Sequence, residues 1–321
     1  MTLEETLKQI KPLNEEKMKT ARRRWDSIAK PLHSLGKMED LITQIVGITG
    51  EEKVDLGKKA LVAMCADNGV VEERVSQSGK EVTFAVAKAM GVNNSSVGKM
   101  AAVAGVDVIP VDIGIDTDEV IPGVLPRKVA KGTKNFAKEP AMTEEEVLKA
   151  IETGVQLVQQ CHREGYEILA TGEMGIGNTT TSTAVAAALL DLEVEQVTGK
   201  GAGLTDEALK RKCRVIEEAI EKYSLRDADA FTILKTVGGL DIAGLTGVFI
   251  GAAIEQMPVV IDGVISAVAA LLSETLCKGA VNYMIPSHKS RELAETAIMK
   301  KLHLDPVLDA DMALGEGTGA V

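Results

Sequence analysis

The residues best suited to chemistry are a glutamate set among glycines and the hydroxyls that follow it. Glu173 lies in the stretch 167–190, EILATGEMGIGNTTTSTAVAAALL, between an apolar run and an alanine-rich run typical of a helix. Its small and polar neighbours are Gly172, Gly175, Gly177, Asn178, Thr179, Thr180, Thr181 and Ser182. Glycines let a backbone approach a ligand closely, and the first N–H groups of a helix lie unpaired at the positive end of its dipole. The order of strand, glycine turn and hydroxyl-rich helix start therefore predicts a phosphate site.

The same pattern also fits an ordinary helix cap, because Asn and Thr commonly cap helices after a glycine turn. It matches neither Walker A nor GxGxxG, so its spacing alone leaves the two interpretations open. Glu173 favours the ligand site, since a carboxylate at the carboxyl end of a strand lies where open α/β sheets bind ligands.

A second carboxylate, Glu316, lies between glycines near the end of the chain, in the run LGEGTGAV. Two glycine-flanked carboxylates predict acid/base or charge-stabilising chemistry at a shared site. A flexible chain end with one solvated glutamate is the alternative that this motif alone leaves open.

The elements that must position these residues are expected to alternate between strands and helices. Apolar runs predict strands at 60–66, 106–111, 168–170, 258–261 and 281–285. Helices are expected within residues 1–49, and at 84–92, 97–104, 144–164, 206–223, 230–237, 241–255, 264–276 and 292–300. This alternation predicts a parallel sheet with crossover helices, whose polar strand ends (DNG, DIG, GEMG, DGV and PSH) meet along one edge. A ligand site is expected along that edge.

Composition excludes several classes of protein. Of 321 residues, 45% are hydrophobic and 26% charged, which is ordinary for a folded globular chain. The formal net charge of −11 argues against nucleic acid or an anionic membrane as a partner. The four cysteines form no CxxC pair, and no apolar run reaches the length of a membrane helix. With no apolar signal core at the N-terminus, these features predict a cytoplasmic protein without a membrane anchor.

Taken together, the motifs resemble a known family. They are ADNGVVEERVSQSGKEVT, DIGID, GEMGIGNTTTSTA, VGGLDIAGLTG, PVVIDG, PSHKSRE and LGEGTGA. Over nearly its whole length the chain resembles the nicotinate-nucleotide–dimethylbenzimidazole phosphoribosyltransferases. The resemblance implies an α/β fold with a mainly parallel, Rossmann-like sheet flanked by helices, and a small helical domain from both chain ends. It places the large nucleotide- and base-binding domain at 50–290 and the small domain at 1–49 with 291–321, and implies a homodimer.

The resemblance also implies the reaction and the residues that carry it. Phosphoribose moves from nicotinate mononucleotide to dimethylbenzimidazole or a related base, giving α-ribazole 5′-phosphate and nicotinate. Glu316 takes the place of the family's general base, and Glu173 lines the same site. The expected contacts of the nucleotide phosphate and ribose are Gly175, Gly177, Asn178, Thr179, Thr180, Lys212 and Ser290. The expected contacts of the base are Ser78, Val86, Met174 and Leu314. The chemistry requires neither a metal nor a redox cofactor.

Two departures from the family leave questions open. Val86 stands where some relatives have a polar residue, so the acceptor could be a benzimidazole, a purine or a phenol. Relatives continue past the tail motif into an apolar helix, so the sequence leaves open whether the chain is truncated after Val321. The alternatives are a non-catalytic or heterodimeric relative, or one that uses phenolic acceptors. A generic dehydrogenase is disfavoured, because no GxGxxG follows the first strand.

Overall fold

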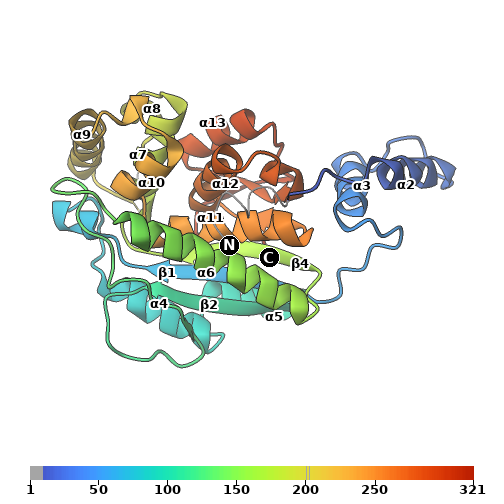
Figure 1. The fold of residues 1–321 in the computed structure, drawn as a ribbon, viewed down its shortest axis with the longest axis horizontal. Helices are drawn as coiled ribbons and strands as arrows, with labels where there is room; N and C mark the ends of the chain where they lie inside the picture. The colour runs from blue at the N-terminus through green and yellow to red at the C-terminus, as the bar shows by residue number, and fades with distance from the viewer. Residues whose placement is uncertain (1–9, 200, 202) are drawn as a thin grey trace.

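A six-stranded parallel sheet forms the centre of the protein (Figure 1). The structure is a computed structural model that describes residues 10–199, 201 and 203–321. The strand order is β3-β2-β1-β4-β5-β6, and every neighbouring pair is parallel. The strands are β1 (Lys59–Ala66), β2 (Val106–Gly114), β3 (Leu125–Pro126), β4 (Ile168–Met174), β5 (Val259–Ile261) and β6 (Met284–Pro286). The predicted α/β class with a mainly parallel sheet is confirmed.

Helices connect these strands and cover both faces of the sheet. The α-helices are α2 (Glu15–Ser27), α3 (Lys37–Thr49), α4 (Glu81–Gly91), α5 (Ser96–Ala104), α6 (Glu144–Arg163), α7 (Asn178–Leu190), α8 (Val194–Val197), α9 (Asp206–Lys222), α10 (Ala230–Val237), α11 (Leu240–Glu255), α12 (Val264–Leu276) and α13 (Leu293–Leu302). Short 3₁₀ turns are η1 (Gly69–Glu73), η2 (Leu225–Asp227) and η3 (Ala280–Tyr283). Within the described ranges, no helix combines the length and apolarity that crossing a bilayer requires.

Strand β1 divides its side chains between the two layers, as the alternation of a strand requires. Ala60, Val62 and Met64 pack with residues of α6 and α11, whereas Leu61 and Ala63 pack on the other face with residues of α4 and α5. These side chains are fully buried. Because both faces are covered, the strand is a continuous apolar run rather than an alternating one.

The polar strand ends gather at one edge, as predicted. Asp67 follows β1, Asp262 follows β5, and Glu173 lies near the carboxyl end of β4. All three are buried. Three parallel strands thus deliver carboxylates to the edge where open α/β sheets bind ligands.

Several boundaries differ from those expected. Strand β4 continues to Met174, so Glu173 lies in the strand rather than in the turn after it, and α7 begins at Asn178. Most of the stretch predicted as a strand at 281–285 is the 3₁₀ turn η3, and β6 begins only at Met284. The Tyr283 side chain in this turn is fully buried, and its hydroxyl donates to the distant Lys11 carbonyl at 2.8 Å, a tertiary contact that no local pattern predicts. A second, two-stranded sheet of β7 (His288–Ser290) and β8 (Leu308–Met312) was not predicted.

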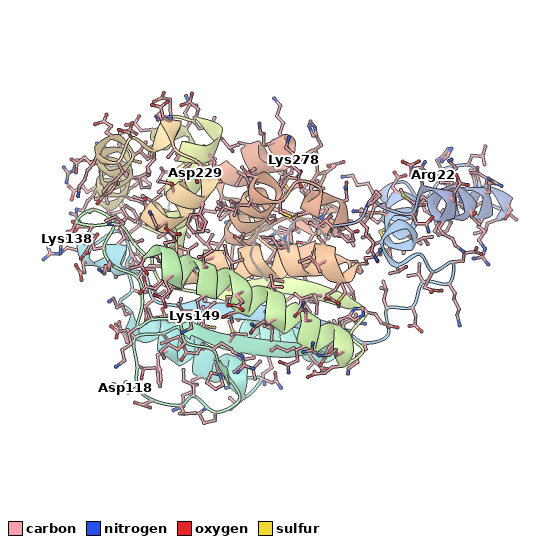
Figure 2. The ribbon with its side chains drawn as sticks, viewed as in Figure 1. Arg22, Asp118, Lys138, Lys149, Asp229 and Lys278 are labelled. Carbon is pink, nitrogen blue, oxygen red and sulfur yellow. The ribbon has the colours of Figure 1, made fainter. Side chains whose placement is uncertain are left out.

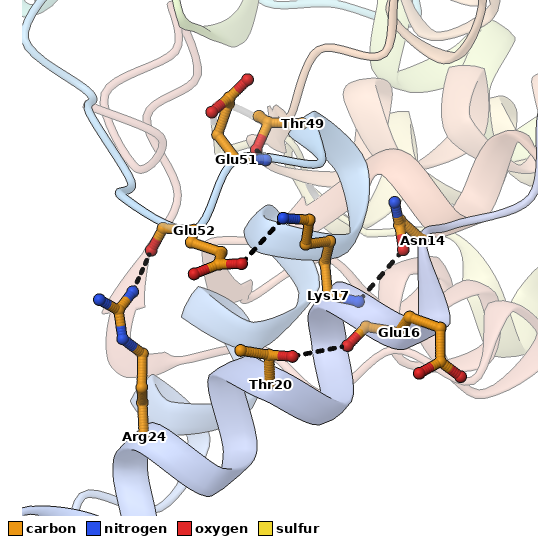
Figure 3. A network of polar contacts seen from close by, with 8 residues as sticks. All are labelled: Asn14, Glu16, Lys17, Thr20, Arg24, Thr49, Glu51 and Glu52. Carbon is orange, nitrogen blue, oxygen red and sulfur yellow. Dashed lines mark hydrogen bonds and ion pairs between the residues drawn. The ribbon is translucent and has the colours of Figure 1, made fainter.

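Helices α2 and α3 stand away from the sheet and are joined to β1 by the linker 50–58 (Figure 1). Lys17 pairs with Glu52 at 2.8 Å and Arg24 donates to the Glu52 carbonyl at 2.9 Å, so α2 is tied to the start of the linker (Figure 3). Charged side chains such as Arg22 project outward from these helices (Figure 2). The helices expected within residues 1–49 are confirmed for α2 and α3, while residues 1–9 lie outside the described part.

The expected division into a large and a small helical domain stays a prediction. At the other end of the chain, α13 packs against α12 and α7, and β8 pairs with β7. The Lys37 ammonium of α3 reaches this region, donating to the Pro306 carbonyl at 2.7 Å.

Candidate active site

A cavity of about 290 Å³ opens at the carboxyl edge of the sheet. Its walls come from the segment before α4, the β4–α7 junction, the start of α12, strand β7 and the tail after β8. The predicted site residues that line it are Val86, Glu173, Met174, Gly175, Gly177, Asn178, Thr179, Ser290, Leu314 and Glu316. Ser78, Thr180 and Lys212 are not among its described lining residues; Val75, Ser76 and Gln77 line it in place of Ser78.

Glu173 is a buried carboxyl group next to the tail. Its relative exposure is only 7%, and burial raises its pKa to about 8. The neighbouring charges of Asp241, Asp262 and Glu316 contribute to this rise, whereas the Asn178 amide, which donates to Glu173 Oε2, opposes it. Glu173 therefore holds a proton near neutral pH, because three carboxylates surround it in a poorly solvated place.

Asn178 joins Glu173 to a third carboxylate, Asp241, near the start of α11. The same amide nitrogen of Asn178 donates to Asp241 Oδ2 at 3.2 Å. Asp241 is fully buried, and burial raises its pKa to about 6. The two amide hydrogens of Asn178 are thus directed at carboxylates, so in this structure they do not face a phosphate. No local pattern marks Asp241 as a site residue, although the VGGLDIAGLTG motif contains it.

The tail brings Glu316 to the same cavity through a tight left-handed turn. Gly315, Glu316 and Gly317 have φ values of 88°, 62° and 93°. Such a conformation costs a residue with a side chain roughly 1–2 kcal/mol. The turn passes so close to β4 that a Cβ atom on Gly172 would lie 2.5 Å from the Glu316 carbonyl oxygen, and one on Gly315 would lie 2.7 Å from Glu173 Oε1. The glycines of both motifs are thus required for close approach, and they bring the two glutamates together.

The Glu316 carboxylate lies at the start of α5. The Val97 N–H donates to Glu316 Oε2 at 3.1 Å, and Val97 is the second residue of that helix. Negative charge is favoured at a helix N-terminus. In the described part of the chain, Glu316 Oε1 has no hydrogen-bond partner, so this oxygen is available to a ligand.

Lys212 lies behind Thr179 rather than on the cavity surface. It is fully buried, and its ammonium donates to Thr179 Oγ1 at 3.0 Å and to the Gly199 carbonyl at 3.3 Å. Burial lowers its pKa to about 8. A buried cation whose hydrogen bonds go to neutral oxygens is more stable with an anion nearby, because the anion favours its charged form.

The start of α12 offers more free N–H groups than the start of α7. In α7 the N–H groups of Asn178, Thr180 and Thr181 donate to the carbonyls of the preceding turn. At α12, Gly263 is the N-cap, and 264–266 form the first turn and line the cavity. No protein acceptor for their N–H groups is present among the described residues, and the same holds for the buried Ser266 hydroxyl. An anion would therefore find donors at α12, with Ser290 also on the cavity wall.

The base-binding residues expected from the sequence form an apolar wall. Val86, Met174 and Leu314 line the cavity together with Val75. A flat aromatic ring would fit such a surface, since ligand sites are mostly apolar with a few placed polar groups. No cluster of three or more His, Cys, Asp or Glu side chains in the described part is arranged to hold a metal ion.

The chain is similar to known phosphoribosyltransferases over nearly its whole length. A family model described as Phosphoribosyltransferase matches residues 10–321. The nicotinate-nucleotide–dimethylbenzimidazole phosphoribosyltransferase of Acetivibrio thermocellus is 47% identical over 316 residues, which cover 98% of this chain and 90% of that protein. The enzyme of the same name from Clostridium perfringens strain 13 is 45% identical, covering 99% and 88%. The crystal structure of CobT from Thermus thermophilus superposes with a TM-score of 0.91 at 35% identity, covering 95% of this chain and 92% of that one.

Proposed function

The chain belongs to the phosphoribosyltransferase family, and on that premise we propose that it transfers phosphoribose from nicotinate mononucleotide to 5,6-dimethylbenzimidazole or a related base. The products are α-ribazole 5′-phosphate and nicotinate, and the reaction belongs to the assembly of the nucleotide loop of cobalamin and other cobamides. The observation that carries this proposal is the family match over residues 10–321, together with two glutamates on one cavity.

Glu316 is proposed to be the general base. The bond between C1′ of the ribose and the ring nitrogen of nicotinate breaks, and its electron pair stays on that nitrogen, which becomes neutral. The acceptor nitrogen forms the new bond to C1′, and its proton passes to Glu316. The leaving ring needs no acid, because it departs from a cationic pyridinium. Attack on the face opposite the leaving group turns a β nucleotide into an α product.

Glu173 is proposed to stabilise the positive charge of the transition state. That transition state resembles an oxocarbenium ion, as in other glycosyl transfers. A raised pKa is compatible with this role, because a bound pyridinium cation favours the ionised form of a nearby carboxyl group. Holding both substrates in the correct relative orientation supplies much of the remaining rate enhancement.

Gly175, Gly177, Thr179 and Ser290 are proposed to border the nucleotide's phosphate and ribose, with the α12 start as donor and Lys212 as the buried cation. Asn178 is part of this wall, with its amide directed at Glu173 and Asp241, and Thr180 supports the wall from behind. Val86, Met174 and Leu314 are proposed to contact the base, with Ser78 nearby. We also propose that the protein works in the cytoplasm as a homodimer, without a metal or redox cofactor.

The test is release of nicotinate when the protein is mixed with nicotinate mononucleotide and dimethylbenzimidazole, followed by chromatography. We expect turnover, and we expect Glu316→Gln to lower kcat by roughly 10² to 10⁴ because the amide accepts no proton. The matched control is Glu152→Gln, an exposed glutamate on α6, which leaves kcat unchanged.

A panel of acceptors separates the alternatives. Turnover with phenols but not with benzimidazoles would identify a phenol-using relative. Binding of nicotinate mononucleotide by calorimetry, without turnover on benzimidazoles, purines or phenols, would overturn the proposal in favour of a non-catalytic relative.

A further inference from the structure

Asp262 holds the turn that carries Glu316. It follows strand β5, and its relative exposure is 2%. Its Oδ2 accepts the Gly317 N–H at 3.1 Å, and its Oδ1 accepts the Gly319 N–H at 2.9 Å. Both carboxylate oxygens therefore bind backbone N–H groups within three residues of Glu316.

The turn that carries Glu316 is also held by hydrogen bonds within itself and by close packing against His288. The Thr318 N–H and hydroxyl both donate to the Gly315 carbonyl, at 3.0 and 2.8 Å, and close the turn on itself. Gly319 lies directly against the His288 ring, where a side chain would collide. A left-handed residue such as Glu316 persists only where its surroundings fix it, and Asp262 supplies the two charged hydrogen bonds that do so from the sheet.

The head of Glu316 is fixed independently, by the Val97 N–H at the start of α5. Its backbone is thus held from the end of strand β5 and its carboxylate from the N-terminus of helix α5. Asp262 and the Val97 N–H therefore restrain different parts of Glu316.

We infer that Asp262 is a positioning residue for Glu316, acting through the Gly317 and Gly319 amides and not through the substrate. This inference rests on the proposed function, in which Glu316 is the base. Asp262 also lines the cavity, so direct contact with the substrate is the competing explanation.

The substitution that separates the two explanations is Asp262→Asn. An asparagine of the same shape has one acceptor oxygen, so its NH₂ group must face one of the two backbone N–H groups. That donor-to-donor contact loosens the turn without changing the volume of the side chain.

We test the inference with four proteins: wild type, Asp262→Asn, Glu316→Gln and the double variant. We expect Asp262→Asn to lower kcat by about 10- to 100-fold, because small displacements of a reacting group are costly. KM for nicotinate mononucleotide is expected to stay within about 3-fold. In the Glu316→Gln background the same change is expected to have no further effect beyond about 2-fold, because its route to the reaction is already removed. A double variant whose losses multiply would overturn the inference and assign the effect of Asp262 to the substrate or to Glu173, whose pKa its charge raises.

Hydrogen exchange provides a readout that needs no activity. We expect the Gly317 and Gly319 amides to exchange at least about 10-fold faster in Asp262→Asn, with exchange in β1 and β4 unchanged, which excludes general misfolding. Unchanged exchange at these amides would show that Asp262 does not hold the turn, and would refute the inference even if kcat fell. If wild type shows no turnover, the proposed function fails while this measurement still decides whether Asp262 holds the turn.

The matched control is Asp112→Asn. Asp112 is also buried near the carboxyl end of a strand, β2, and accepts the Ile115 N–H at 2.9 Å. Because it does not line the main cavity, we expect kcat and the exchange of the tail amides to match wild type.

Discussion

At the scale of single residues, five carboxyl groups and one buried lysine lie in the cavity wall or directly behind it. Glu173, Asp262, Glu292 and Glu316 line the cavity, while Asp241 lies behind Asn178 and Lys212 behind Thr179. Burying like charges together is costly unless some are protonated or a cation joins them. The site is therefore suited to a ligand that carries both a positive centre and an anionic group, as nicotinate mononucleotide does.

The raised pKa of Glu173 predicts how the free energy of unfolding depends on pH. Its pKa is raised from 4.5 to about 8 in the folded protein by burial and by Asp241, so the folded state keeps a proton that the unfolded state releases. The stabilisation is fully present below about pH 4.5 and is lost as the pH rises towards 8. Glutamine resembles the protonated glutamate at every pH. We therefore expect the free energy of unfolding of wild type to fall relative to Glu173→Gln by up to roughly 1.4 kcal/mol per pH unit within that window.

The measurement is urea unfolding of both proteins at a series of pH values from about 5 to about 8.5, without substrate, which spans most of that window. Glu152→Gln serves as the control, because it makes the same replacement at an exposed position on α6. A difference between wild type and Glu173→Gln that stays constant across the series would show that Glu173 is already ionised in the folded state.

At the scale of elements, the sequence predicts what local patterns determine. The helix from 144 has the capping box formed by Thr143 and Glu146, and both of its hydrogen bonds are present. The helix α11 packs closely against α6 at two of its glycines: a Cβ on Gly247 or Gly251 would meet atoms of α6, whereas one on Gly244 would meet side chains of β1 and β2. The strand β6 was misplaced because burial of Tyr283 is a tertiary effect with no local pattern. The sheet of β7 and β8 is equally non-local.

Gly247 tests that close helix contact. An added Cβ would collide with the Ile151 carbonyl of α6, and backbone cannot move aside as a flexible side chain can. We expect Gly247→Ala to lower the free energy of unfolding by about 1–3 kcal/mol, the usual cost of overpacking. KM for nicotinate mononucleotide is expected to stay the same below the unfolding transition, because Gly247 does not line the cavity.

Urea unfolding provides the measurement, and Gly57→Ala is the control. A Cβ on Gly57 meets only carboxylate oxygens, the nearest being that of Asp55 at 3.2 Å, which can rotate away. We expect that control to stay within about 0.5 kcal/mol of wild type. Equal stability of Gly247→Ala and wild type would mean that α6 and α11 can separate without cost.

At the scale of the whole molecule, the motifs identify the family, and the family match confirms it over 10–321. Glu173 and Glu316 could be selected from sequence because each is marked by flanking glycines. The role inferred for Asp262 could not, since a strand-end Asp followed by Gly is common and its partners are 55 and 57 residues away. Asp241 was missed for the same reason. Local sequence motifs can indicate the residues that line a cavity. The residues that hold them in place are identified only from tertiary contacts between segments that are distant in the sequence.

The linker 50–58 tests how the molecule is divided. Lys53 and Lys58 are exposed, whereas the sheet that follows is buried, so trypsin is expected to cut here before it cuts between β1 and the tail. The described cavity lining comes entirely from residues 75–316.

We therefore expect the protein cut at Lys53 to bind nicotinate mononucleotide as tightly as the intact chain, measured by calorimetry on the purified digest. The variant with Lys53 and Lys58 both replaced by Gln is the control and is expected to lose this first cut. A first cut between residues 291 and 321, or loss of binding after cleavage at Lys53, would contradict the prediction. It would mean that the domain containing the sheet does not keep its binding site without α2 and α3.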